Sequence, residues 1–189
     1  MMKENRGFIF YHVVPSPFGE VGVVWYLKTG RPRVAEILLP RPGGTMAGII
    51  EADNPRAERR SHSGLNTLIA ELQRYMATGA DNFSQELLDM GRCNEFQKRV
   101  FEKLSEVPRG KVISYGQLAD RISAPRAARA VGTAVARNPF PIVLPCHRVV
   151  KTGGGLGHFG GGSTLKKALL RLEGVDINVN GHIGTDFFW

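Results

Sequence analysis

Cys146 and His147 are the residues of this chain whose types and spacing most directly suggest chemistry. A free cysteine is mostly protonated at neutral pH, so a nucleophilic cysteine needs a base or a positive charge nearby. His147 can be that base and Glu173 can orient its imidazole, as in other nucleophile–base–carboxylate arrangements. Adjacent residues of an extended chain point to opposite sides, so a bridging water could relay the proton. A buried cysteine beside a structural histidine is the commoner arrangement, and both interpretations stay open here.

The two cysteines, Cys93 and Cys146, cannot form a disulfide framework, and their spacing is not that of a zinc site. A reduced, intracellular compartment fits this cysteine usage. The remaining histidines form no spaced pair with a carboxylate or cysteine that suggests metal binding; they are His12, His62, His158 and His182. We expect His62 to lie on the solvated surface of a loop.

Positive charge is concentrated in the C-terminal half of the chain. Residues 92–173 contain 15 Lys and Arg against 5 Asp and Glu, a balance of +10. The rest of the chain has 10 against 12, a balance of −2. This asymmetry suggests a surface for a polyanion, nucleic acid first and an anionic membrane second. A basic face without a partner is the alternative.

The composition bounds the class of protein. A chain of 189 residues, with 42% hydrophobic and 22% charged residues, can form one large domain or two small ones. No apolar run approaches the roughly 18 residues of a membrane helix. The N-terminus lacks the apolar region and cleavage site of a secretory signal. We therefore expect a cytoplasmic protein, nuclear in a eukaryote, with no membrane partner.

The elements that must position these residues begin with strands. Apolar, β-branched stretches predict strands at 7–14, 19–27 and 34–40. Residues 41–64 are rich in Gly, Pro and charge and predict a loop, and apolar residues at helical spacing predict a helix at 64–78 that ends at Gly79. Residues 81–93 then link the two halves.

The second half is predicted to be mostly helical. A helix at 94–107 presents an apolar face, and a short strand and a short helix follow over 111–122. Ser123 is a plausible N-cap for a helix over 125–137, which stops at Asn138-Pro139. Two short helices joined by a tight turn, the second of them rich in arginine, resemble a helix-turn-helix.

Helical geometry divides the faces of the 125–137 helix. One arc is apolar and should face the core; it contains Ala127, Ala130, Val131, Ala134 and Val135. Ala128, Gly132 and Ala136 form a neighbouring strip of small residues with Arg129 at its edge, and Arg126, Thr133 and Arg137 continue the polar side. Such a strip lets a helix approach a phosphate-lined groove closely. Tight packing on a neighbouring helix explains it equally well.

The glycine-rich run at 152–163 is a second unusual stretch. It lacks the Gly-Lys-Ser/Thr ending of a phosphate-binding loop, and no strand clearly precedes it. We interpret it as a close-approach loop whose backbone amides line a pocket. A helix over 165–174 follows.

Together these motifs resemble the C-terminal domain of O6-alkylguanine-DNA alkyltransferases, over residues 96–174. The matching elements occur in the order of that family; they are VISYGQLA, PRAARAVGTAVARNP, PIVLPCHRVV, the glycine loop with its following lysine, and LLRLEG. The resemblance implies an α/β (α+β) fold: a small, strand-rich, RNase H-like domain at 1–91, and a mostly helical domain at 92–175 with a winged helix-turn-helix-like motif. The tail at 176–189 matches nothing.

The resemblance implies repair of alkylated DNA by direct reversal of the damage. Cys146 would accept the alkyl group from an O6-alkylguanine flipped out of double-stranded DNA, in a single turnover. His147 would deprotonate the cysteine through a water while Glu173 orients the imidazole. Tyr115 would protonate the departing guanine and help rotate the nucleotide, and Asn138 would brace the turn beside the cysteine.

The resemblance also implies the contacts with DNA. Arg129 would replace the extruded nucleotide in the base stack, Ala128 and Gly132 would lie against the minor groove, and Arg126 and Tyr115 would add contacts. The guanine edge would be read by the backbones of Cys146, Val149 and Gly160, with Val135 and Phe159 walling the pocket. Tyrosine is common in the family in place of Phe159, and serine can stand in place of Gly160, which affects the size of the pocket.

Family precedent implies a monomer that needs no cofactor. Some relatives bind zinc through the N-terminal domain, but this chain has no cysteine before Cys93, so we expect no metal. Two other classes of protein would explain part of the sequence. A non-catalytic lesion-binding relative typically has tryptophan where this chain has Cys146. A thiol hydrolase would use Cys146 and His147 but would leave the basic, arginine-rich half unexplained.

Overall fold

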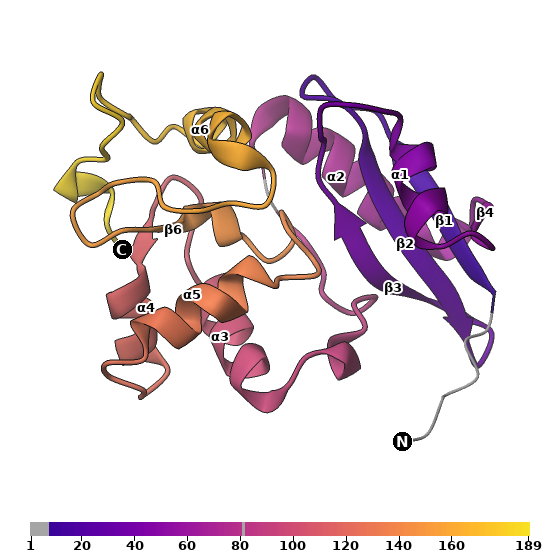
Figure 1. Ribbon diagram of the computed structural model, residues 1–189, viewed down its shortest axis with the longest axis horizontal. Coiled ribbons are helices and arrows are strands. Elements are labelled where there is room, and N and C mark those ends of the chain that lie inside the picture. The colour runs from indigo at the N-terminus through magenta and orange to yellow at the C-terminus, as the bar shows by residue number, and fades with distance from the viewer. Residues whose placement is uncertain (1–7, 81) are drawn as a thin grey trace.

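The computed structural model describes residues 8–80 and 82–189, which form a strand-rich N-terminal half and a mostly helical C-terminal half (Figure 1). The mixed α/β fold class predicted from the sequence is confirmed at this level. Gly7 of the first predicted strand and Asp81 of the predicted linker lie outside the described residues.

The N-terminal half is built on a sheet of strand order β3-β2-β1-β4. Its strands are β1 (Ile9–Val14), β2 (Val21–Lys28), β3 (Arg31–Leu38) and β4 (Glu58–Arg59). The first three are antiparallel neighbours and β4 runs parallel to β1. The three predicted strands are therefore confirmed, with boundaries shifted by a few residues.

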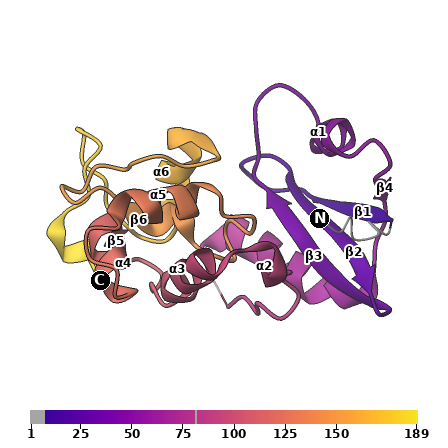
Figure 2. The same cartoon turned by 60° about the horizontal axis from the view of Figure 1, so that its bottom comes forward.

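Both faces of this sheet are covered, because alternate side chains of a strand point to opposite faces. On one face Val14, Val23 and Trp25 pack with α2 (Asn66–Thr78). On the other face Val13 and Val24 pack against α1 (Met46–Asp53). Figure 2 shows the two helices on opposite sides of the sheet.

The prediction that residues 41–64 form only a loop is wrong, because this segment contains α1 and β4. Thr45 caps α1, its hydroxyl accepting a hydrogen bond from the Gly48 amide. Met46 and Ile50, one helical turn apart, are buried against the sheet. With only two buried positions, a short helix leaves little periodicity for sequence analysis to detect.

His62, which the sequence placed on the solvated surface of a loop, is half-buried. Its Nδ1 accepts a hydrogen bond from the Gly64 amide at 3.0 Å and so caps the 3-10 turn at Ser63–Leu65. Its ring packs edge-on against Trp25, with 5.4 Å between centroids. His62 therefore fixes the start of α2, the helix predicted for residues 64–78.

Four α-helices, one pair of short strands and two 3-10 turns follow in the described residues, after a 3-10 turn at Met90–Arg92. The helices are α3 (Glu95–Ser105), α4 (Tyr115–Arg121), α5 (Ala128–Ala136) and α6 (Gly162–Leu172). The strands are β5 (Ile113–Ser114) and β6 (Val149–Val150), and the 3-10 turns are Cys146–Arg148 and Thr185–Phe187. Capping boxes begin both α3 and α4, formed by Asn94 with Gln97 and by Ser114 with Gln117. The two short helices α4 and α5, joined by a tight turn, are the predicted pair.

Two predictions about α5 are wrong. Ser123 does not cap it: the helix starts at Ala128, and Ser123 and Arg126 both have positive φ, of 55° and 73°. These left-handed conformations form the turn between α4 and α5. The helix therefore begins three residues later than predicted, at Ala128. Ala130 is exposed rather than part of the core face, whereas Val131, Ala134 and Val135 are buried as expected.

The tail at 176–189, unassigned from the sequence, pairs with the C-terminal half. The Ile183 amide donates to the Gly154 carbonyl, and the Trp189 amide donates to the Val112 carbonyl. The Arg121 guanidinium stacks on the Trp189 ring at 3.6 Å from its centroid. The tail therefore supports the glycine-rich loop, the residue before β5 and the end of α4. Across the described ranges, no helix is long and apolar enough to cross a membrane.

Candidate active site

Cys146 lies in a 3-10 turn rather than after a strand. The preceding residues Ile142 and Val143 form a turn in which Ile142 has φ 76°, a strained conformation for a β-branched residue. Asn138 holds this turn at both ends: its Nδ2 donates to the Leu144 carbonyl at 2.8 Å, and its Oδ1 accepts from the Phe140 amide at 2.9 Å. The apolar residues 142–144, whose composition is typical of a strand, therefore form a turn before Cys146.

The structure brings His147 and Glu173 together in the core. His147 Nε2 lies 2.7 Å from Glu173 Oε1, and both side chains are inaccessible to solvent. Glu173 follows α6, whose buried face of Leu165, Leu169 and Leu170 fixes the end of that helix against the core. Packing of α6 therefore carries the carboxylate to the imidazole across 26 positions of sequence.

Arg148 is a site residue that the sequence analysis missed. Its Nε donates to Glu173 Oε2 and its Nη2 to Glu173 Oε1, each at 2.9 Å, while Nη1 donates to the Val107 carbonyl at 2.7 Å. Such a two-point contact fixes the plane of the carboxylate. Its place directly after Cys146-His147 was visible in the sequence, but its inward direction was not.

Tyr75 is the second missed residue, and it comes from α2 in the N-terminal half. Its hydroxyl donates to Glu173 Oε1 at 2.7 Å and lies 2.9 Å from His147 Nε2. The side chains are buried, so no bulk solvent competes for these groups. In the sequence Tyr75 reads only as one apolar position of an amphipathic helix.

The hydrogen bonds assign the tautomer of His147. An unprotonated Nε2 would place its lone pair against the carboxylate oxygen at 2.7 Å, so Nε2 carries the hydrogen and donates to Glu173. Nδ1 then holds the free lone pair. This atom is buried and has no hydrogen-bond partner among residues 8–80 and 82–189. Nδ1 is therefore the basic atom of the imidazole.

Charge in this cluster follows from burial and from Arg148. Burial lowers the pKa of His147 below its ordinary value of 6.5, although Glu173 acts in the opposite direction. Burial alone would raise the pKa of Glu173, but His147 and Arg148 outweigh it and hold the pKa of that carboxyl well below its usual range. We infer a neutral imidazole beside an ionised carboxylate, with Arg148 supplying the compensating charge.

The thiol of Cys146 has its own surroundings. Burial raises the pKa of Cys146, while the Asn138 side chain and the Lys166 ammonium act in the opposite direction. Lys166, also missed from the sequence as a site residue, is buried and donates from Nζ to the Val149 carbonyl at 2.6 Å. Its burial lowers the pKa of Lys166 to about 8. A proton acceptor is needed because the resting thiol is protonated.

Tyr115, the first residue of α4, faces the glycine-rich loop. A Cβ added at Gly157, where φ is +69°, would lie 2.9 Å from the Tyr115 hydroxyl, so glycine allows this close approach. Burial raises the pKa of Tyr115, and the nearby Cys146 adds to that effect. Tyr115 is therefore protonated at neutral pH and can donate its proton.

Three of the four predicted pocket residues are buried. Val149 is fully buried, Phe159 and Val135 are each 6% exposed, and Gly160 is exposed. The Phe159 ring lies edge-on to the His147 ring, with 6.3 Å between centroids. Phe159 therefore borders the imidazole of His147, while Gly160 lies at the surface.

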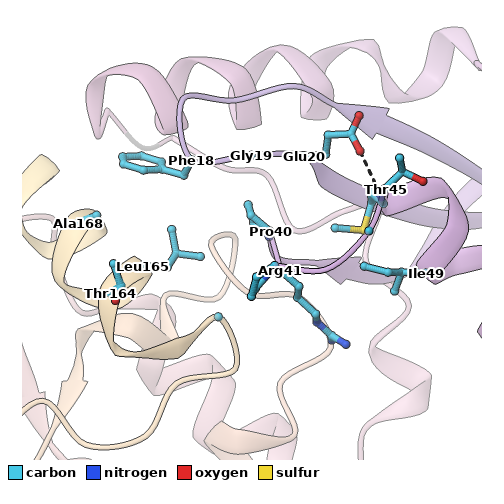
Figure 3. Close-up of a pocket in the computed structure, with 14 residues that line it drawn as sticks. Phe18, Gly19, Glu20, Pro40, Arg41, Thr45, Ile49, Thr164, Leu165 and Ala168 are labelled. Atoms are coloured by element: carbon cyan, nitrogen blue, oxygen red, sulfur yellow. Dashed lines mark hydrogen bonds between the residues drawn. The ribbon is translucent and has the colours of Figure 1, made fainter.

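A cleft of about 600 Å³ lies elsewhere, between α6 and the N-terminal half (Figure 3). Phe18 and Leu165 face it from the two halves, and Arg41 stands in the loop before α1. Glu20 accepts a hydrogen bond from the Met46 amide at its rim. The cleft contains none of the predicted site residues, so we place the chemistry at Cys146 and not in this cleft.

The predicted DNA-binding residues lie on α4, on α5 and in the turn between these helices. Arg126 and Arg129 are exposed, while Ala128, Gly132 and Tyr115 are half-buried. A Cβ added at Gly132 would lie 3.8 Å from Tyr115, an ordinary contact. Tight packing on α4 therefore does not require glycine at this position, which weakens the helix-packing explanation of the small-residue strip.

The fold and the site are those of DNA-binding proteins with a cysteine-centred active site. The family model described as "6-O-methylguanine DNA methyltransferase, DNA binding domain" matches residues 95–175. The methylated-DNA–protein-cysteine methyltransferase of Methanothermobacter thermautotrophicus is 32% identical over 176 residues, covering 93% of this chain and 92% of that protein. The chain belongs to the methylated-DNA–protein-cysteine methyltransferase family.

Solved structures agree with this assignment. The O6-methylguanine methyltransferase of Mycobacterium tuberculosis has a TM-score of 0.70 and 33% identity, covering 88% of this chain and 93% of that one. A structure of the M. tuberculosis OGT in complex with DNA has a TM-score of 0.68 and 34% identity, covering 87% and 92%. The likeness therefore extends across both halves of the chain.

Proposed function

We propose that this protein flips an O6-alkylguanine out of duplex DNA and moves the alkyl group to Cys146, once per molecule and without a cofactor. The general activity follows from family membership: the protein is an O6-methylguanine DNA methyltransferase that binds DNA and repairs alkylated DNA. The observation that carries the residue assignment is the buried contact of His147 with Glu173 directly beside Cys146.

The proposed transfer begins with removal of the thiol proton. The proton passes from Cys146 Sγ through one water to His147 Nδ1, the basic atom of the neutral imidazole. Glu173 then stabilises the imidazolium, and Lys166 and Asn138 favour the thiolate. These groups act together to make a nucleophile from a thiol that is protonated at rest.

The thiolate then attacks the alkyl carbon. An S–C bond forms, the C–O6 bond breaks, and Tyr115 donates a proton to the departing guanine. The product is a thioether, and no group near Cys146 among the described residues offers a way to reverse it, so each molecule would act once. O6 is out of reach in a stacked duplex, so the nucleotide must rotate out, with Arg129 filling the gap.

The DNA-binding surface completes the proposal. Arg126, Arg129 and the small residues Ala128 and Gly132 would lie along the minor groove. Val135, Val149, Phe159 and Gly160 would surround the flipped base. The domain limits at 91 and 175, a monomeric state and a cytoplasmic location are parts of the same proposal, and light scattering tests the monomer.

Transfer of labelled alkyl groups tests the proposal. With labelled O6-methylguanine in a duplex and no cofactor, label should appear on protein at no more than about one group per molecule. Peptide mapping should find it on Cys146. Sustained turnover well beyond the protein concentration would contradict the single-use mechanism, and binding without label would indicate a non-catalytic lesion-binding protein instead.

The rate of transfer should fall as the pH drops below 6.5. The pKa of His147 lies below that value, so the imidazole is neutral at neutral pH and loses its basic lone pair only on acidification. Single-turnover rates with free O6-benzylguanine, between about pH 5 and 8, should give an acidic midpoint below 6.5. The fluorescence of the buried Trp25 checks that the protein stays folded. A midpoint above 6.5 would show that burial does not lower the pKa of His147.

A further inference from the structure

Tyr75 is the residue by which the N-terminal half enters the candidate active site. It lies 72 positions from His147 and 98 from Glu173 in the sequence, yet its hydroxyl contacts both. The phenol is fully buried in the core shared by the two halves. The mechanism described above uses no group from this half of the chain.

The end of α2 is fastened to the end of α6, which places Tyr75 beside Glu173. Gly79 ends α2 with φ 71°, and a Cβ there would lie 2.5 Å from the Leu172 carbonyl oxygen, so only glycine allows this approach. The Arg109 guanidinium spans the same junction, 3.4 Å from the carbonyls of both Thr78 and Leu172. These contacts, made one residue before Glu173, hold the two helix ends together.

The hydroxyl of Tyr75 has one proton, and its geometry assigns that proton to Glu173 Oε1. Its oxygen then faces Nε2–H of His147 at 2.9 Å and shares that hydrogen with the carboxylate. Oε1 thereby receives hydrogen bonds from Tyr75, His147 and Arg148. Phenylalanine would keep the ring in place and remove one donor from the carboxylate and one acceptor from the imidazole.

We propose that Tyr75 is a positioning residue of the transfer reaction: its hydroxyl holds the Glu173 carboxylate and the Nε2–H tautomer of His147 in place, so that the N-terminal half completes the active site. The inference rests on the proposed function, because the proposed function assigns His147 Nδ1 as the base for Cys146. Tyr75 touches neither the thiol nor the alkyl group, and acts through Glu173 and His147.

Tyr75→Phe in the full chain tests this role. Single-turnover rates at saturating alkylated duplex and with free O6-benzylguanine should both fall about tenfold or more, the scale of a hydrogen bond to a charged group. The DNA concentration at half-saturation should not change, since Tyr75 lies in the core. Tyr26→Phe is the matched control, because it also removes a hydroxyl–carboxylate hydrogen bond in the N-terminal half, to Asp89 at 2.8 Å. Tyr26→Phe should react at the wild-type rate, and its thermal midpoint should be similar to that of Tyr75→Phe.

A double-mutant cycle separates positioning from packing. If Tyr75 acts through the carboxylate, Tyr75→Phe should slow the Glu173→Gln protein much less than it slows wild type. An unchanged rate in Tyr75→Phe, an equal fall in both backgrounds, or the same loss in Tyr26→Phe would overturn the inference. Wild-type protein that takes up no label would contradict the proposed function instead, so the two failures are distinguishable.

Discussion

Cys146→Ala should abolish alkyl transfer and leave DNA binding intact. The thiolate is the atom to which the alkyl carbon would bond, and alanine offers no nucleophile in its place. The Cys146 side chain is buried, whereas Arg126 and Arg129 are exposed, so its loss should not alter these exposed arginines. Label transfer and a binding titration with the same alkylated duplex measure the two properties together.

Cys93→Ser is the control for this variant. Cys93 is buried just before α3, burial raises the pKa of its thiol, and it has no contact with His147 among the hydrogen bonds of the described residues. It should keep most of the wild-type transfer rate. Label on Cys93 would show that the nucleophile is wrongly assigned, and loss of both transfer and binding in Cys146→Ala would show that Cys146 is structural.

Arg129→Ala should slow repair of duplex DNA by tens-fold or more. The side chain is exposed at the start of α5, beside the half-buried Ala128 and Gly132, where it can enter the base stack. Removing it should shift the flipping equilibrium by a few kcal/mol, the scale of unstacking, and roughly 1.4 kcal/mol is tenfold in rate. The single-turnover rate at saturating duplex measures the effect.

The free base O6-benzylguanine is the control, because it needs no flipping and should react almost normally with Arg129→Ala. A role limited to phosphate contact predicts weaker binding and a salt dependence smaller by about one unit, with the rate at saturation unchanged. Equal loss with duplex and free base would mean that Arg129 maintains the fold. No loss with either would remove Arg129 from flipping.

Local sequence patterns were sufficient to predict the long strands, the helix α2 and the family of this protein. Apolar, β-branched stretches predict the three long strands, and the Leu68–Leu72–Met76 spacing with Gly79 predicts α2 and its end. Residues 96–174 carry motifs specific enough to indicate the family that the comparisons show. Such features can be predicted from the sequence because caps, turns and helical faces depend on residues only a few positions apart.

The conformations of short and strained segments could not be predicted from local sequence patterns. The turn before Cys146 resembles a strand in composition, but Asn138 and the positive φ of Ile142 bend it. Ser123 has the composition of a helix cap, yet it lies in a left-handed turn before α5 begins. In each case contacts with other parts of the fold outweigh local preference, which amounts to a small energy per residue.

The chain by itself thus determined which cysteine is the candidate nucleophile, while the tertiary structure decided which groups surround it. Arg148 turns inward to Glu173, Lys166 is buried against Val149, and Tyr75 arrives from the other half of the chain. No local pattern marks these side chains, because each needs a partner brought close by the packing of α2 and α6. A buried charge or hydroxyl is stable only where such partners exist, and only the folded core supplies them.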